Sequence, residues 1–313
     1  MMVLILVLTS LTFVGDKWSS SSSAVASPGC RVVSPGSTTL TLNVNGFKRV
    51  VVVHVPLGTK ASTPKALVLN LHGSFNTATY QETLSNMDAT ANANKFIVAY
   101  PQAYIASNGG YQWNVTPLYG GAVVPPNSPN DVSFLTNLVK ILERHYCIDP
   151  KRVYATGYSG GAREVSQLGC QSSTVFAAIA PVDGLRMPSP CNARRAVSVI
   201  AFHGSADPIN PFDGNGQAYW TYSVTSAIND WGSQDGCTSS VTIGSGTTTV
   251  VRTQFSGCAN GSSVELYEVI GEGHEWPGGP PVSPSLLSFL GPQKNAISAS
   301  ALMWSFFRSH RLR

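Results

Sequence analysis

The sequence predicts an α/β fold in which helices cover both faces of a mostly parallel sheet that begins with an antiparallel hairpin. Two observations lead to this prediction. Nearly continuous apolar runs, such as residues 66–71 and 96–100, are typical of strands buried on both faces. Segments with helical apolar spacing alternate with these runs. Such alternation indicates parallel β-α-β units with right-handed crossovers.

Composition narrows the class of protein. The chain has 313 residues, of which 43% are hydrophobic and only 12% charged, as in a well-packed globular protein. Its net charge is +4, without a block of Lys and Arg, so no nucleic-acid partner is expected. No Pro/Gly linker or internal repeat divides the sequence. We therefore expect one domain over residues 27–313.

The N-terminal segment predicts export. Residues 3–8 form an apolar run that is too short to span a bilayer. A Ser-rich stretch follows, and Ala24-Val25-Ala26 fits the small-residue pattern before a cleavage site. We interpret residues 1–26 as a secretory signal peptide, although no positive charge precedes the apolar run. The protein is thus expected to be secreted and extracellular, with no membrane span. The alternative is a disordered tail on a cytosolic enzyme.

Cysteine usage agrees with export. The six cysteines are Cys30, Cys147, Cys170, Cys191, Cys237 and Cys258. None forms a C-x-x-C pair, which argues against a zinc site or thioredoxin-like chemistry. An even count in an exported chain predicts three disulfides. Cys237 and Cys258 flank a Thr/Ser/Gly-rich excursion, so we expect them to pair locally. Sequons at Asn114 and Asn260 also fit a secreted glycoprotein.

The first half of the chain predicts a hairpin followed by β-α units. Strand-like runs at 40–44 and 49–55 are joined by Asn45-Gly46, a strong hairpin signal. The elements expected next are a strand at 66–71, a helix at 77–93, a strand at 96–100 ended by Pro101, an irregular stretch at 102–129 and a helix at 131–143.

The second half continues the alternation. A strand beginning near Arg152 leads to Ser159 and into a helix that ends near Cys170. The remaining expected elements are strands at 176–180 and 196–202, a helix around 217–232, the excursion between Cys237 and Cys258, a last strand at 264–270 and a last helix at 295–310.

The pentapeptide Gly157-Tyr158-Ser159-Gly160-Gly161 lies between the predicted strand and helix. A serine hydroxyl is a useful nucleophile only where it stands clear of its neighbours, beside a base and oxyanion donors. Glycines two residues before and after the serine let strand and helix approach closely around a strained apex. The sequence therefore predicts a nucleophile elbow at Ser159. The alternative is a Gly-rich turn without chemistry.

A base and an acid follow in the expected order. His274 lies in a Gly-rich turn after the last predicted strand, and Asp207 lies just beyond the strand at 196–202. A histidine base needs such an acid to hold its tautomer and to stabilise the imidazolium. Asp213 and Asp183 are the second and third candidates for the acid. The order Ser159, Asp207, His274 is that of the α/β-hydrolase fold.

An oxyanion hole requires backbone N–H donors. Gly160, directly after the nucleophile, is expected to supply one of them. The second should come from the loop after the strand at 66–71, from Ser74 or alternatively Phe75. His72 and Gly73 in the same loop are expected to shape it without taking part in the chemistry.

Aromatic residues near these positions are candidates for substrate binding. Trp113 lies on the stretch at 102–129, and loops of this length in compact domains are usually functional. Trp276 comes two residues after His274, and Tyr158 directly precedes the nucleophile. We expect all three to bind substrate, with ordinary aromatic packing as the alternative for the two tryptophans.

These motifs resemble a secreted esterase family that joins polyhydroxybutyrate-depolymerase-like proteins with carbohydrate esterase family 1 feruloyl esterases. The matching stretches, in order over about residues 65–310, are Leu71-His-Gly-Ser74, Phe96-Ile-Val-Ala-Tyr-Pro101, Gln112-Trp-Asn114, Asn130-Asp-Val132, Tyr146-Cys-Ile-Asp149, Arg152 to Ala162, Phe202-His-Gly-Ser-Ala-Asp207 and Gly273-His-Glu-Trp-Pro-Gly-Gly279. The placement of Cys147 and Cys170 is similar to that in fungal feruloyl esterases of the group. The resemblance implies an α/β-hydrolase fold, no metal or organic cofactor, and ester hydrolysis through an acyl-serine.

Carried over by position, the resemblance makes Ser159 the nucleophile, Asp207 the acid and His274 the base. Gly160 stands where relatives often carry Asn, Ala or Trp, and Ser74 stands where many carry Cys. Feruloyl esters of plant cell-wall polysaccharide are the first expected substrate, and poly- or oligo(3-hydroxybutyrate) is the second. Acetylxylan or a short-chain ester is the third. A catalytically silent binding protein on the same fold is the hypothesis from another class.

Overall fold

The computed structural model describes residues 34–59, 63–214, 217–244 and 248–313. The predicted signal peptide, residues 1–26, lies outside the described residues. The main sheet has the strand order β1-β2-β4-β3-β7-β8-β9-β12-β11-β10. Its strands are β1 (Gly36–Val44), β2 (Phe47–Val55), β3 (Lys65–Leu71), β4 (Ile97–Pro101), β7 (Ile148–Tyr158), β8 (Ala178–Val182), β9 (Ser198–Gly204), β10 (Ser239–Ile243), β11 (Val250–Ser256) and β12 (Val264–Val269). The six strands from β4 to β12 in this order are mutually parallel.

Both edges of the sheet are antiparallel. At the N-terminal edge β1 and β2 form the predicted hairpin around Asn45 and Gly46, which both have positive φ. At the other edge β10 and β11 add two antiparallel strands beyond β12. The sequence prediction placed no strand between Cys237 and Cys258. All five residues of β10 are exposed, and its apolar alternation is limited to Val241 and Ile243, too short to indicate a strand.

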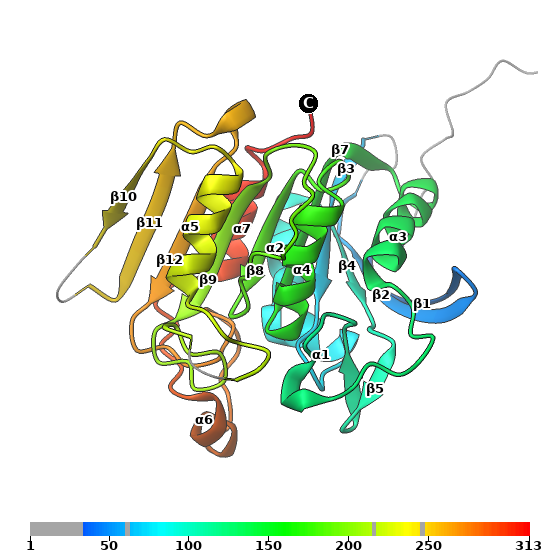
Figure 1. The fold of residues 1–313 in the computed structure, drawn as a ribbon. Helices are drawn as coiled ribbons and strands as arrows, with labels where there is room; N and C mark the ends of the chain where they lie inside the picture. Colours follow the sequence, from blue (N-terminus) through cyan, green and yellow to red (C-terminus); the bar gives the residue numbers. More distant parts are fainter. Residues whose placement is uncertain (1–33, 60–62, 215–216, 245–247) are drawn as a thin grey trace, which may run out of the picture.

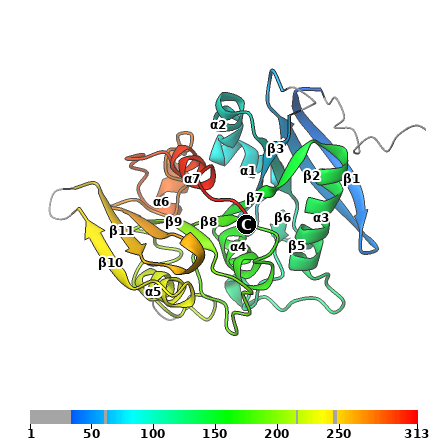
Figure 2. The same cartoon turned by 90° about the horizontal axis from the view of Figure 1, so that it is seen from above.

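The helices cover both faces of the sheet, as predicted. In two perpendicular views α3, α4 and α5 lie on one face, and α1, α2 and α7 lie on the other (Figures 1 and 2). The helices are α1 (Ala78–Ser85), α2 (Met87–Asn94), α3 (Asp131–His145), α4 (Gly160–Gln171), α5 (Val224–Gln234), α6 (Pro284–Leu290) and α7 (Ala299–Phe307), with short 3-10 turns at Tyr119–Gly121 and Ala259–Gly261.

Helix boundaries differ from the prediction at four places. The single helix expected at 77–93 is divided at Asn86, which adopts a left-handed conformation with φ of 45°. Helix α5 begins later than expected, because the Ser223 side chain caps it at Val224. Helix α7 is shorter than the predicted span of 295–310. Helix α6, which was not predicted, lies beyond the carboxyl ends of the parallel strands (Figure 1).

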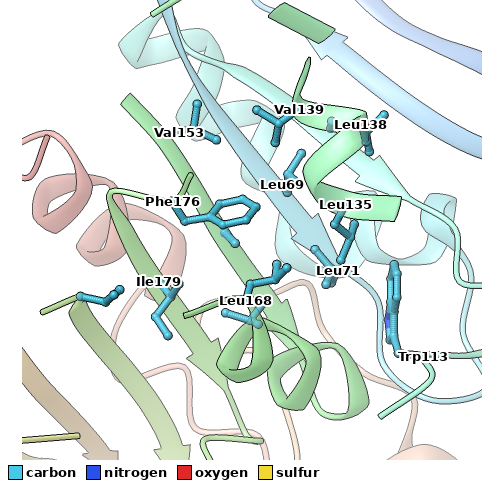
Figure 3. Close-up of a cluster of buried hydrophobic side chains, with 14 of the residues drawn as sticks. Leu69, Leu71, Trp113, Leu135, Leu138, Val139, Val153, Leu168, Phe176 and Ile179 are labelled. Atoms are coloured by element: carbon cyan, nitrogen blue, oxygen red, sulfur yellow. The ribbon is translucent and has the colours of Figure 1, made fainter. Parts of the chain in front are cut away.

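Each face of the sheet has its own apolar core, because strand side chains alternate in direction. On β3, Leu67, Leu69 and Leu71 belong to the core beneath α3, α4 and α5, whereas Ala66 and Val68 belong to the opposite one. Figure 3 shows the first of these cores, with side chains from α3 and α4 packed against the central strands. The long irregular stretch also holds a short hairpin, β5 (Ile105–Ser107) and β6 (Gly110–Gln112).

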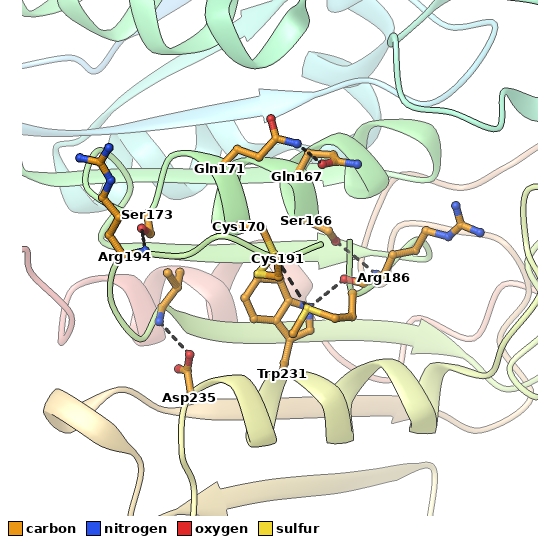
Figure 4. Close-up of a disulfide and its surroundings, with 12 residues drawn as sticks. Ser166, Gln167, Cys170, Gln171, Ser173, Arg186, Cys191, Arg194, Trp231 and Asp235 are labelled. Carbon is orange, nitrogen blue, oxygen red and sulfur yellow. Dashed lines mark hydrogen bonds between the residues drawn. A yellow bond between two sulfur atoms is a disulfide. The ribbon is translucent and has the colours of Figure 1, made fainter. Parts of the chain in front are cut away.

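The predicted Cys237–Cys258 disulfide is confirmed and closes the excursion that contains β10 and β11. A second disulfide joins Cys170, at the end of α4, to Cys191 in the segment that follows β8 (Figure 4). Cys147 is likewise disulfide-bonded. Among the described residues, no helix combines the length and the apolar character that crossing a membrane would require.

Candidate active site

Ser159 stands at a sharp turn between β7 and α4, as the elbow prediction requires. Its φ of 54° and ψ of −116° are strained for a residue with a side chain. The turn is held because the Ser159 N–H donates to the Val182 carbonyl oxygen at 2.9 Å. A Cβ on Gly157 would lie 2.8 Å from the Gly161 backbone, and one on Gly161 would lie 2.5 Å from the Leu71 carbonyl oxygen. Both glycines therefore permit the close strand–helix contact.

Three side chains from the ends of three parallel strands meet in one hydrogen-bonded chain. The His274 Nε2 atom lies 2.9 Å from the Ser159 hydroxyl oxygen. On the other side of the ring, Nδ1 lies 2.7 Å from Oδ2 of Asp207. Ser159, Asp207 and His274 are 8%, 4% and 3% exposed, so these three side chains are shielded from bulk water. The Ser159 end of the hydrogen-bonded chain opens into a cavity. This is the arrangement of a serine nucleophile, a base and an orienting acid.

The surroundings of Asp207 keep it ionised. Burial acts to raise its pKa, but the charge of His274 and hydrogen bonds from His203 and His274 outweigh burial and hold the pKa well below its ordinary value. Its Oδ1 atom also accepts the N–H groups of Ile209 and Asn210, each at 2.8 Å.

The two alternative acids do not contact His274. Asp213 is exposed at the surface. Asp183 is fully buried behind Asp207, and burial together with the charge of Asp207 raises its pKa well above the ordinary value. Because burial disfavours the ionised form of Asp183, this residue is less suited than Asp207 to stabilise an imidazolium.

Ser74 and Gly160, the two predicted oxyanion donors, come from segments that lie in close contact. The loop after β3 packs so closely on the elbow that a Cβ on Gly160 would lie 3.2 Å from the Ser74 nitrogen. Phe75, the alternative donor, is excluded because its N–H donates to the Tyr111 carbonyl oxygen at 2.9 Å. Within the described residues, neither the Ser74 nor the Gly160 N–H has a hydrogen-bond partner.

His72 orders the loop that presents Ser74. Its Nε2 accepts the Ala103 N–H at 3.0 Å, so the proton is on Nδ1, which donates to the Gly73 carbonyl oxygen at 2.7 Å. Burial lowers the pKa of His72 to about 4, which keeps the ring neutral. The Trp113 indole donates to the His72 carbonyl oxygen at 2.7 Å.

The prediction that both tryptophans line the substrate cavity is wrong. Trp113 is 1% exposed and packs in the core, where its hydrogen bond steadies the oxyanion loop. Trp276 is fully buried and donates to the Ser300 hydroxyl at 3.1 Å. Tyr158 does line the cavity, and its hydroxyl donates to the His274 carbonyl oxygen at 2.6 Å.

A cavity of about 210 Å³ opens beside Ser159 and is lined mainly by apolar and aromatic side chains. Its lining residues are Ser74, Phe75, Asn76, Tyr80, Tyr119, Tyr158, Ser159, Ile209, His274, Leu286, Phe289 and Leu290. Sequence reasoning missed most of these residues, including the three from α6. The sequence signals for α6 were the apolar cluster at 286–290 and the Ser283-Pro284 pair at its start, in a Pro- and Gly-rich region. A larger hollow, of about 510 Å³, surrounds Arg195 and His310 and contains no triad residue.

With this geometry established, comparison with known proteins identifies the family. The family described as Esterase PHB depolymerase matches residues 51–263. The chain belongs to this family.

Individual relatives include both types of esterase suggested by the sequence. Feruloyl esterase B of Piromyces equi is 28% identical over 244 residues, which are 72% of this chain and 42% of that protein. Feruloyl esterase C of Emericella nidulans is 28% identical over 225 residues, 60% of this chain and 80% of that protein. Poly(3-hydroxyalkanoate) depolymerase C of Paucimonas lemoignei is 34% identical over 137 residues, 42% of this chain and 30% of that protein. The chain thus spans less than half the length of the first and the third.

Solved structures confirm the predicted α/β-hydrolase fold. An acetyl xylan esterase from Aspergillus awamori superimposes with a TM-score of 0.56 at 16% identity, over 82% of this chain and 99% of that one. A thermostable esterase gives 0.57 at 16% identity, over 88% of this chain and 63% of that one. At such identities the likeness establishes the fold alone.

Proposed function

We propose that the protein is a serine carboxylic-ester hydrolase that works through an acyl-enzyme. The observation that supports this most strongly is the hydrogen-bonded chain from Ser159 through His274 to Asp207, beside two N–H groups that have no hydrogen-bond partner in the part of the protein that the structure describes. In the first step His274 Nε2 takes the Ser159 proton as the hydroxyl oxygen attacks the ester carbonyl carbon. The N–H groups of Gly160 and Ser74 stabilise the negative oxygen of the tetrahedral intermediate.

The alcohol then leaves with the proton that His274 carries, and the acyl group remains on Ser159. In the second step His274 takes a proton from water, which attacks the acyl-serine. Collapse of this second intermediate returns the proton to Ser159 and releases the carboxylic acid. Asp207 stays ionised throughout, holds the tautomer of His274 and stabilises its imidazolium.

The preferred substrate that we propose is a hydroxycinnamoyl ester, such as the feruloyl esters of plant cell-wall polysaccharide. Aromatic rings of Phe75, Tyr80, Tyr119 and Phe289 line the cavity beside the nucleophile, as suits a flat aromatic acyl group. Relatives named feruloyl esterases support the same choice. Poly- or oligo(3-hydroxybutyrate) is the second candidate, favoured by the family match and by the relative named a poly(3-hydroxyalkanoate) depolymerase.

We further propose that the enzyme acts outside the cell. The disulfides Cys170–Cys191 and Cys237–Cys258 suit an oxidising compartment. The predicted signal peptide at residues 1–26 supports the same location. Mass spectrometry of the protein from culture medium would test both, with a mature N-terminus near residue 27 as the expected result and a retained N-terminal segment inside the cell as the contradictory one.

One experiment tests the function and ranks the substrates. Initial rates are measured on methyl ferulate, a 3-hydroxybutyrate oligomer and p-nitrophenyl acetate, with the wild type and Ser159→Ala side by side. The proposal predicts hydrolysis of all soluble esters by the wild type, with the highest kcat/KM for methyl ferulate, and none by the folded variant. Equal activity of the variant would refute the mechanism. An inactive wild type that still binds the esters would support the silent binding protein.

A further inference from the structure

Two fully buried polar side chains, His203 and Asp183, lie directly behind Asp207. His203 is on β9, and Asp183 follows β8; both are 0% exposed. The His203 Nε2 atom lies 3.4 Å from Oδ2 of Asp207, the same oxygen that meets His274. On the other side of the ring, Nδ1 lies 4.0 Å from Oδ1 of Asp183. The proposed reaction assigns neither residue a role, and burying both is costly unless their contacts compensate.

The contacts of His203 determine where its proton lies. Its Nε2 atom is 2.7 Å from the carbonyl oxygen of Asn210, which can only accept a hydrogen bond. Nε2 therefore carries a proton, and that N–H faces both the carbonyl oxygen and the Asp207 carboxylate. Within the described residues, Nδ1 has no hydrogen-bond partner. The indole of Trp220 stacks on the ring with centroids 5.8 Å apart, which restrains its orientation.

The cluster concentrates one negative charge at Asp207. Its Oδ1 atom accepts two backbone N–H groups, and its Oδ2 atom meets N–H groups from His274 and His203. Asp183 has a single donor, the Gly204 N–H at 3.1 Å to Oδ1, and its Oδ2 atom has none among the described residues. Donors aimed at an oxygen favour its ionised form, and their absence favours the protonated form.

We propose that His203 is a positioning residue, whose Nε2–H fixes the Asp207 carboxylate with Oδ2 directed at His274 and shares its negative charge. This role rests on the proposed function of the triad. Other titratable groups around the triad and His203 are Asp183, Glu268, Glu272, Glu275, Tyr158 and Tyr219. Removing the His203 donor leaves these groups in place, and Asp207 is then held only by the Ile209 and Asn210 N–H groups on Oδ1 and by His274 on Oδ2. The unshared charge on Asp207 then stabilises the His274 imidazolium more strongly.

The test compares two replacements of His203 by the pH dependence of kcat/KM on p-nitrophenyl acetate. His203→Leu keeps much of the side-chain volume but donates nothing, whereas His203→Gln keeps an N–H donor on a side chain of similar reach. For the leucine variant we expect kcat/KM to fall about tenfold and the acidic limb to move up by about half a pH unit. The glutamine variant should keep most activity and the wild-type limb. Asp183→Asn, which changes a carboxyl group that does not contact His274, should change neither.

An unchanged rate and pH profile in His203→Leu would overturn the inference. If Ser159→Ala is inactive in the same assay, that outcome refutes the role of His203 alone, whereas an active Ser159→Ala refutes the triad itself. Should His203→Leu not fold, 15N NMR of the wild-type histidines decides. The inference requires that the His203 ring carries its proton on Nε2 and none on Nδ1. Observation of the opposite tautomer would overturn the inference.

Discussion

Helix α6 presents two large apolar side chains to the catalytic cavity without burying them. Leu286 is 44% exposed and Phe289 is 58% exposed, and no residue of the helix is buried. The helix is nevertheless tied to the catalytic loop, because the His274 N–H donates to the Leu290 carbonyl oxygen at 2.6 Å. We predict that an aromatic acyl group covers both side chains, so that Leu286→Ala/Phe289→Ala weakens the binding of feruloyl esters.

The magnitude follows from the exposed fractions. Fully burying a Leu or Phe side chain contributes about 1.5–3 kcal/mol. In the folded protein Phe289 is still 58% exposed and Leu286 is still 44% exposed. Covering the remainder is therefore worth about 1 kcal/mol for each side chain, or about 2 kcal/mol together. This corresponds to a rise in KM of about 30-fold for the double variant and about 5-fold for each single variant.

The assay measures kcat and KM on methyl ferulate and on p-nitrophenyl acetate, whose acetyl group is too short to reach α6. KM should rise only for methyl ferulate. Its kcat should be nearly unchanged, because the lost contacts stabilise the bound ground state and the transition state equally. Val241→Ala is the matched control. Val241 is 53% exposed on β10, at the far edge of the sheet, so its truncation removes exposed apolar area without touching the cavity.

A KM for methyl ferulate that stays at the wild-type value would refute the reasoning about α6. A loss confined to 3-hydroxybutyrate oligomers would contradict the choice of an aromatic acyl group. Equal losses on both esters would show that the variant disturbs His274 through the Leu290 hydrogen bond, and the specificity role would then be wrong.

Two further predictions concern stability. Burial, followed by the charges of Glu272 and Asp207, raises the pKa of Glu275 from an ordinary 4.5 to about 7. The folded state therefore disfavours the ionised form, and the penalty grows as pH rises from about 4.5 through 7. The difference in Tm between Glu275→Gln and the wild type should therefore be about 2–4 °C larger in favour of the variant at pH 8 than at pH 5. A difference in Tm that does not change with pH would contradict this. The Cys170–Cys191 bridge closes a separation of 21 residues, so its double serine variant should lose about 3 kcal/mol in chemical denaturation. Loss below about 1 kcal/mol would contradict the loop-entropy argument.

The meeting of Ser159, Asp207 and His274 was predictable because each of these residues follows a buried strand. Parallel strands all end at one edge of the sheet, so Ser159, Asp207 and His274 had to meet there once their strands were identified. The glycines around Ser159 were equally informative, since close strand–helix contact leaves no room for a Cβ. The choice of Ser74 over Phe75 needed the structure, because it depends on where one backbone N–H donates.

The substrate wall could not be predicted in the same way. Whether Trp113 and Trp276 face the cavity or the core depends on contacts with His72 and Ser300, which are distant in sequence. Helix α6 has seven residues, too few for apolar periodicity to distinguish it from a loop. Strands such as β10 form through pairing with a neighbour and carry only a short apolar pattern of their own.

The central claim is that Ser159 becomes the acyl-enzyme. Its most direct test treats the protein with a fluorophosphonate and measures intact mass, followed by peptide mapping. The proposed mechanism predicts a single adduct on the peptide that contains Ser159, loss of esterase activity in proportion to labelling, and no adduct in folded Ser159→Ala. An unlabelled wild type, or a modified residue other than Ser159, would contradict it.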